Sequence, residues 1–215
     1  MAVKRGFKSP FDYFASIQHK KLLVMNGHIE LLTGFGVPQL EKETEFVEDD
    51  INKFLDDVIP TLPFQPYDFQ EKAFKESLLN GKQINKMCTG SGKSLTISLI
   101  AEFFRRIGKK GLILVPNINL LSQFFNDIKE YNLYDLSNEV HIIGGGKSIK
   151  HFNKSLTIST WQSLANHREG LDELDYVICD ELHRFASEET SAIVKETINC
   201  KYKWGFTGTL PEDPS

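Results

Sequence analysis

The sequence predicts an α/β fold in which helices flank a parallel sheet, preceded by a small β-containing domain. From residue 83 onward, apolar runs typical of buried strands alternate with helical segments, and this alternation indicates a parallel sheet. Polar or small residues follow most of these runs directly. Because ligands collect at the carboxyl ends of strands in open α/β sheets, these positions are the candidates for a functional site.

Composition sets the broad class. The chain has 215 residues, of which 40% are hydrophobic, and this length suggests one or two domains with a buried core. Its formal net charge of -4 argues against nonspecific coating of nucleic acid, although a net charge hides local basic patches. The cysteines lack CxxC spacing, so we expect neither a disulfide framework nor a zinc site. No apolar run reaches about 18 residues, which predicts no membrane partner and a cytoplasmic location.

Residues 1–60 form the predicted accessory domain. Its start combines aromatic side chains with basic ones, a pattern that suits nucleic acid, and the alternative is an aromatic core beneath a solvated basic face. The basic residues are Lys4, Arg5, Lys8, Lys20 and Lys21. Asn26-Gly27 separates two apolar runs and predicts a hairpin. Eight acidic residues from 41 to 57 predict a charged linker, in which apolar residues at helical spacing also allow a helix.

Residues 61–215 form the predicted ATP-binding domain. Three prolines precede a predicted helix over 68–80, which Gly81 ends. Further helices are expected at 95–104, 118–131 and 161–166. Strands are expected at 83–88, 111–115, 140–143, 156–159 and 176–179.

A glycine-flanked lysine after the first strand predicts a phosphate-binding loop. Gly90 and Gly92 lack a Cβ, so this loop can adopt positive φ and turn its backbone N–H groups toward phosphate oxygens. Lys93 supplies charge, and Ser94 places a hydroxyl for Mg²⁺ at the start of a helix. The full phosphate-loop pattern has a glycine at the position of Met87. Because this glycine is missing, the alternative interpretation is an ordinary flexible turn.

Two adjacent carboxylates follow the apolar strand at 176–179. A carboxylate at this place can hold Mg²⁺, and its neighbour can orient the water that attacks a phosphate. We therefore assign the metal to Asp180 and the water to Glu181, with Lys93 as the third catalytic residue. An acidic helix N-terminus is the alternative for the pair alone. Together with the loop, the pair predicts an enzyme that hydrolyses a nucleoside triphosphate.

The chain resembles the DExH-type helicases of superfamily 2. Thr89–Ser94, Asp180–His183 and Thr207–Thr209 look like motifs I, II and III of that family. The resemblance implies a RecA-like motor lobe that uses ATP and Mg²⁺, and it accounts for Met87, since the family often lacks that glycine. The implied ATP-binding residues are Tyr67, Gln70, Thr89, Gly90, Ser91, Gly92, Lys93 and Ser94.

The resemblance also implies individual roles. Gln70 is expected to read the adenine edge, and Tyr67, where relatives often have arginine, to stack on adenine. His183 is expected to bond Thr207 or Thr209 and to couple the nucleotide to the nucleic-acid face.

Two further loops resemble motifs that grip a sugar–phosphate backbone. The implied contacts are Pro116, Asn117, Gly145, Thr160, Trp161 and Gln162, together with Lys4, Arg5 and Lys8 of the N-terminal domain. The alternative makes the loop side chains helix caps. The segment 142–147 with Thr160–Gln162 looks most like phage-encoded branch-migration and repair helicases. This implies branched or forked DNA as the partner, in the host cytoplasm.

The chain ends just after the third motif. We expect the second motor lobe, which supplies arginines for phosphoryl transfer, to be absent from this chain, and the chain alone to be inactive. One rival is a nucleotide-dependent switch or assembly ATPase that does not bind nucleic acid. Another makes residues 1–60 a protein-docking domain. The choice of DNA or RNA, the polarity and the oligomeric state stay open.

Overall fold

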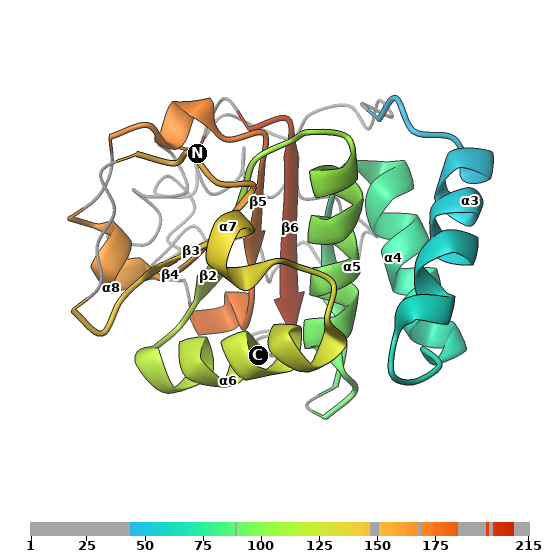
Figure 1. Ribbon diagram of the computed structural model, residues 1–215, viewed down its shortest axis with the longest axis horizontal. Helices are drawn as coiled ribbons and strands as arrows, with labels where there is room; N and C mark the ends of the chain where they lie inside the picture. Colours follow the sequence, from blue (N-terminus) through green and yellow to red (C-terminus); the bar gives the residue numbers. More distant parts are fainter. Residues whose placement is uncertain are drawn as a thin grey trace, which may run out of the picture.

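The computed structural model describes residues 44–88, 90–146, 151–166, 169–184, 197 and 200–208. Six parallel strands form one sheet in the order β1-β6-β5-β2-β4-β3 (Figure 1). This confirms the predicted α/β class. The strands are β1 Lys82–Lys86, β2 Gly111–Val115, β3 Val140–Ile143, β4 Leu156–Thr160, β5 Tyr176–Cys179 and β6 Tyr202–Thr207.

The helices agree closely with the sequence pattern. Helix α4 ends where predicted, because Gly81 takes up a φ of 68° there. Helix α6 begins after Asn117, whose side chain accepts a hydrogen bond from the Leu120 N–H at 3.0 Å. The helices are α3 Glu48–Val58, α4 Asp68–Asn80, α5 Lys93–Arg106, α6 Ile118–Tyr131, α7 Leu136–Glu139 and α8 Trp161–Leu164. Short 3₁₀ turns are η3 Ile59–Thr61, η4 Leu171–Glu173 and η5 Leu182–Arg184.

Each face of the sheet has its own core. Side chains of α3, α4, α5 and α6 join one cluster with alternate residues of the strands, including Trp204 of β6. Trp204 also donates a hydrogen bond from its indole Nε1 to the Ser77 carbonyl at 2.9 Å, which fastens α4 to the sheet. The opposite face is covered by a smaller cluster that includes Leu164 of α8 and Leu182 of η5. Strands buried on both faces explain the continuous apolar runs of the sequence.

The acidic segment contains a packed helix over residues 48–58, which the apolar residues at helical spacing had allowed. Ile51 and Val58 are fully buried, and the Phe54 ring stacks on Phe74 of α4 at a centroid distance of 5.3 Å. Figure 1 shows α3 beside α4, on the side away from α5. The acidic residues at its start are exposed, because an amphipathic helix turns its charges outward.

Several predictions concern residues outside the described part of the chain. They include Lys4, Arg5, Lys8, the hairpin at Asn26-Gly27, Thr89 and Thr209. The division of the chain at residue 60 also stays a prediction. Within the described ranges, no helix is both long and apolar enough to cross a membrane.

Candidate functional site

The loop between β1 and α5 adopts the backbone that its glycines predict. Gly90 and Gly92 have φ values of 78° and 72°, and α5 begins directly afterwards at Lys93. A Cβ on Gly92 would lie 2.3 Å from the side-chain nitrogen of Gln70, whereas a Cβ on Gly90 meets nothing within 4 Å. Position 92 therefore requires glycine for its conformation and for its contact with α4.

Gln70 ties the start of α4 to this loop. Its Nε2 donates to the carbonyls of Ser91 at 2.8 Å and Gly92 at 3.3 Å, while its Oε1 accepts from the Tyr67 N–H at 2.9 Å. Both amide protons are thereby used, and one lone pair of Oε1 is left for a ligand. The Tyr67 ring is 67% exposed and stacks on Phe69 with an interplanar angle of 12°.

Lys93 and the acidic pair meet at the carboxyl edge of the sheet. The Lys93 Nζ lies 2.9 Å from Glu181 Oε1, and the Glu181 backbone has a positive φ of 51°. Asp180 accepts a hydrogen bond from the Glu181 N–H at 3.0 Å. Burial raises the pKa of Asp180 to about 6; the Glu181 charge adds to the rise and the Lys93 charge opposes it. A bound cation would favour the ionised form of this carboxylate.

A cavity of about 340 Å³ joins these residues to helix α6. Its lining combines a lysine, a serine hydroxyl and carboxylates, and oxygen ligands of this kind suit Mg²⁺. It is lined by Gly90, Gly92, Lys93, Ser94, Leu120, Gln123, Phe124, Asp127, Asp180 and Glu181. At the loop, the buried Ser91 Oγ has no hydrogen-bond partner among the described residues, as expected where a polar ligand binds. The residues therefore fit a Mg²⁺–triphosphate group.

Helix α6 adds polar side chains that the sequence interpretation missed. The Tyr131 hydroxyl lies 2.8 Å from Ser94 Oγ, and Asp127 lines the cavity one turn earlier. Burial raises the pKa of Asp127, and the nearby Ser94 side chain opposes this rise. With Gln123, these residues recur every four positions, which is the only signal in the sequence that places them on one helical face.

His183 connects the acidic pair to the last strand. Its Nδ1 lies 2.8 Å from Thr207 Oγ1 and 3.4 Å from Glu181 Oε2. Burial lowers the pKa of His183, and the Glu181 charge opposes this effect. The predicted contact with Thr207 is present, while its coupling role stays a prediction.

The loops predicted to contact DNA follow β2, β3 and β4 at the same sheet edge. Asn117 and Thr160 act as helix caps, as the alternative interpretation held: Thr160 Oγ1 accepts from the Ser163 N–H at 3.2 Å. Pro116 is buried, Trp161 is partly buried and Gln162 is exposed. Gly145 has a φ of 58° and lines a groove with Ile118 of α6. The contact of these loops with a sugar–phosphate backbone stays a prediction.

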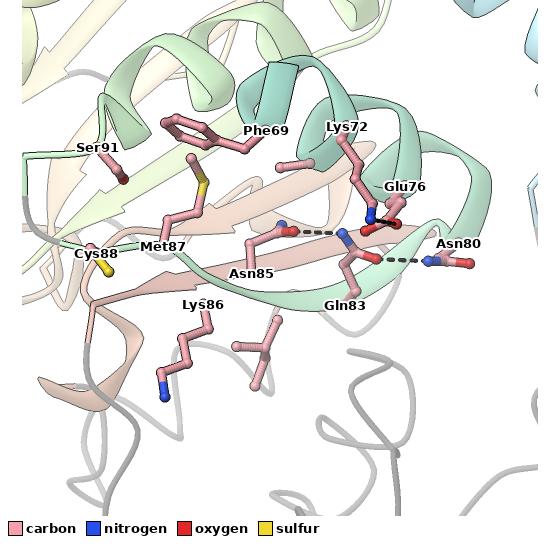
Figure 2. A pocket seen from close by; sticks show the side chains of 12 residues that line it. Phe69, Lys72, Glu76, Asn80, Gln83, Asn85, Lys86, Met87, Cys88 and Ser91 are labelled. Carbon is pink, nitrogen blue, oxygen red and sulfur yellow. Dashed lines mark hydrogen bonds and ion pairs between the residues drawn. The ribbon is translucent and has the colours of Figure 1, made fainter. Parts of the chain in front are cut away.

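A larger cavity of about 820 Å³ lies between α4 and β1 (Figure 2). Its polar wall is a chain of amides in which Gln83 donates to Asn85 at 2.6 Å and accepts from Asn80 at 2.7 Å. Phe69, Met87 and Ser91 line it near the phosphate-binding loop, as Figure 2 shows.

Comparisons with known proteins give consistent matches. Residues 63–212 match the family model described as "Type III restriction enzyme, res subunit". The chain is 28% identical over 181 residues to the ATP-dependent DNA helicase uvsW of Enterobacteria phage T4, covering 80% of this chain and 36% of that protein. The ATP-dependent RNA helicase DBP10 of Debaryomyces hansenii is 23% identical over 165 residues, covering 68% of this chain and 18% of that protein.

Solved structures agree on the fold. The crystal structure of the UvsW helicase from bacteriophage T4 matches with a TM-score of 0.70 and 25% identity, covering 94% of this chain and 72% of that one. A DEAD box protein from Methanococcus jannaschii matches with a TM-score of 0.56 and 21% identity, covering 78% of this chain and 50% of that one. The sheet and its helices are therefore a RecA-like fold. The chain spans about a third of the length of its phage T4 relative.

Proposed function

The chain belongs to the family described as the res subunit of type III restriction enzymes, and from this premise we propose that it is the ATP-binding lobe of a DNA helicase or translocase. Its substrate is branched or forked DNA, in replication, recombination or repair within the host cytoplasm. The observation that carries the proposal is the meeting of Lys93, Ser94, Asp180 and Glu181 around one cavity at the carboxyl edge of the sheet. The phage T4 relative, described as an ATP-dependent DNA helicase, supports it.

The proposed roles follow from the chemistry of each group. The loop N–H groups from Gly90 to Gly92 and the N-terminus of α5 hold phosphate oxygens, and Lys93 neutralises their charge. Ser94 and Asp180 hold Mg²⁺, which when bound offsets the charge of the phosphates. Lys93 pairs with Glu181 at 2.9 Å, so a phosphate that attracts Lys93 releases Glu181 to orient the attacking water. His183 contacts both Glu181 and Thr207, so a movement of Glu181 changes the contact between His183 and Thr207.

We propose that adenine lies near the start of α4. The free lone pair of Gln70 Oε1 suits the adenine amino group, and the exposed Tyr67 and Phe69 rings offer apolar faces for stacking. Phe69 extends this surface to the larger cavity (Figure 2). Phe69 is an addition to the predicted site residues.

Nucleotide binding is tested first. We expect the 215-residue chain to bind a fluorescent ATP analogue with Mg²⁺, and Lys93→Ala to weaken that binding at least tenfold without loss of fold, as judged by circular dichroism. Lys109→Ala is the matched control, because Lys109 is also paired with a carboxylate, Asp175 at 3.0 Å, away from the cavity. Equal affinity of Lys93→Ala and wild type would refute the phosphate-binding role.

DNA binding separates the proposal from its rivals. Fluorescence anisotropy with single-stranded, duplex and forked DNA, with and without a nonhydrolysable ATP analogue, is expected to show nucleotide-dependent binding to the fork. If Lys4, Arg5 and Lys8 contact phosphates, deletion of residues 1–40 reduces the dependence of log affinity on log salt, by about 0.9 per lost phosphate contact on duplex. A nucleotide switch binds no DNA at all, and a docking role for residues 1–60 leaves the salt dependence unchanged.

A further inference from the structure

We propose that Tyr131 and Asp127 of helix α6 are positioning residues that orient the Ser94 hydroxyl toward Mg²⁺ and thereby set the magnesium dependence of nucleotide binding. This rests on the proposed nucleotide site and adds two residues to it. Neither residue belongs to the glycine-rich loop or to the acidic pair. Asp127 and Tyr131 lie 33 and 37 residues beyond Ser94 in the sequence, so loop patterns do not reveal them.

The contacts come from one face of α6. Tyr131 is the last residue of the helix, is 7% exposed, and places its hydroxyl 2.8 Å from Ser94 Oγ. Asp127 lies one turn earlier, lines the cavity with Lys93, Ser94 and Asp180, and lies near enough to Ser94 for the Ser94 side chain to influence its pKa. The Ser94 hydroxyl is thus bonded to Tyr131 and shares the cavity with Asp127, both from another element.

The hydrogen-bonding capacity of the Ser94 hydroxyl leaves room for a metal ion. Such a group has one proton to donate and two lone pairs that accept. In the pair with Tyr131, either hydroxyl can be the donor. If Tyr131 donates, it occupies one lone pair of Ser94 Oγ, and if Ser94 donates, both lone pairs stay free. In either direction at least one lone pair of Ser94 Oγ remains that a metal ion can use.

Tyr131 is held firmly enough for this task. Its ring belongs to the larger core cluster, and the Phe64 ring meets it edge-on at a centroid distance of 5.7 Å. Asn132 then ends the helix in the left-handed conformation, with a φ of 55°. Outer groups that fix the orientation of a metal ligand reduce the cost of binding the metal.

A nearby tyrosine provides a matched control. Tyr134 is also buried and donates from its hydroxyl to the Ser98 carbonyl of α5 at 2.7 Å, one turn after Ser94. Both Tyr131→Phe and Tyr134→Phe remove one buried hydrogen bond to the same helix. Only Tyr131 bonds a side chain that the proposal assigns to the metal.

The test measures affinity for a fluorescent ATP analogue in Mg²⁺ and in EDTA, using the full 215-residue chain. The ratio of the two affinities is the magnesium enhancement. We expect Tyr131→Phe to reduce the enhancement about three- to tenfold, the effect of one lost hydrogen bond, while the affinity in EDTA stays within about twofold. Asp127→Ala is expected to lower the enhancement in the same way, and Tyr134→Phe to preserve it. Thermal unfolding confirms that each variant is folded.

The remaining outcomes overturn the proposal. An unchanged enhancement in both Tyr131→Phe and Asp127→Ala removes the positioning role. An equal loss of affinity in Mg²⁺ and EDTA makes the role structural, and a larger enhancement means that Tyr131 competes with the metal. If the wild type binds no nucleotide in either solution, the proposed nucleotide site itself fails, which is a distinguishable result.

Discussion

At the scale of single residues, the ion pair of Lys93 with Glu181 joins the phosphate-binding loop to the acidic pair. The side chains are 10% and 18% exposed, so little solvent reaches them and each charge is compensated by the other. Removing one partner of a largely buried pair leaves the other uncompensated. Variants that keep the shape and hydrogen bonding of Glu181 therefore test its chemistry more cleanly than truncations do.

Glu181→Gln is the first such variant. Its amide oxygen can still accept from Lys93, so we expect nucleotide affinity within about threefold of wild type. A neutral amide cannot assist the attacking water, and turnover by a protein with both motor lobes is expected to fall about 10² to 10⁴-fold. Calorimetry and phosphate release provide the two measurements. Glu139→Gln is the control, because Glu139 also forms an ion pair, with Arg105 of α5, away from the cavity. Normal turnover by Glu181→Gln would assign the attacking water to another group.

Gly92→Ala tests the fit between the loop and α4. The alanine Cβ would lie 2.3 Å from Gln70 Nε2, and Gln70 is only 4% exposed, so its amide has little room to move. Gly90→Ala is the matched control, since φ is positive there too but a Cβ meets nothing within 4 Å. We expect Gly92→Ala to lower the free energy of unfolding by about 1 to 3 kcal/mol more than Gly90→Ala in urea titrations. An equal loss of free energy of unfolding in Gly92→Ala and Gly90→Ala would show that backbone strain alone causes it.

At the scale of elements, helix α3 is part of the core of the RecA-like fold although it precedes the prolines at 60, 63 and 66. Its buried residues contact α4 and α5, and the Arg106 guanidinium lies over the Phe54 ring at 5.3 Å from its centroid. A fragment that begins at residue 61 would expose this surface of α4 and α5. We infer that an independently folding lobe includes α3.

Substitutions in α3 test this inference. Ile51→Ala removes a fully buried side chain, and we expect the free energy of unfolding to fall by about 2 to 5 kcal/mol. Asn52→Ala, at the exposed neighbouring position, is expected to change it by about 0.5 kcal/mol or less. Urea unfolding followed by tryptophan fluorescence suits the measurement, because Trp204 lies in the same core. Similar values for the two variants would mean that α3 contributes little to the fold.

At the scale of the whole molecule, the two faces of the sheet differ in polarity. The face under α3 to α6 is lined by aromatic rings, whereas the other face holds a buried lysine, Lys203 of β6, which is 3% exposed. Burial lowers the pKa of Lys203 to about 8, and the charge of Lys82 adds to this. Global stability should therefore depend on pH through this residue.

The sign follows from proton binding. The folded pKa lies below the unfolded value, so the unfolded chain binds more protons between pH 8 and about 10, and stability rises with pH there. Lys203→Met removes the buried charge and is expected to raise the free energy of unfolding by about 1 to 3 kcal/mol at pH 7. The difference in free energy of unfolding between Lys203→Met and the wild type should shrink toward pH 9.5, because the folded wild type then carries an uncharged Lys203. Lys201→Met, at an exposed position, is the control, and a pH-independent difference for Lys203→Met would contradict the proposed cause.

The sequence by itself determined the fold class and the two halves of the candidate site. Alternating apolar strands and helices predict a parallel sheet because buried strands need both faces covered. The glycines at 90 and 92 and the carboxylates at 180 and 181 are local patterns, and each lies in the loop that follows a strand. Parallel strands bring their carboxyl ends to one edge, so these patterns were bound to converge.

Only the tertiary structure decided which side chains meet at that edge. Tyr131 and Ser94 are separated by 37 residues, Lys93 and Glu181 by 88, and helix packing decides such contacts. The acidic segment shows the same limit, because its apolar spacing allowed a helix while the surface that buries this helix, on α4 and α5, depends on tertiary packing. Local spacing predicts which face of a helix is apolar or polar, but the partner of that face depends on how the whole chain packs.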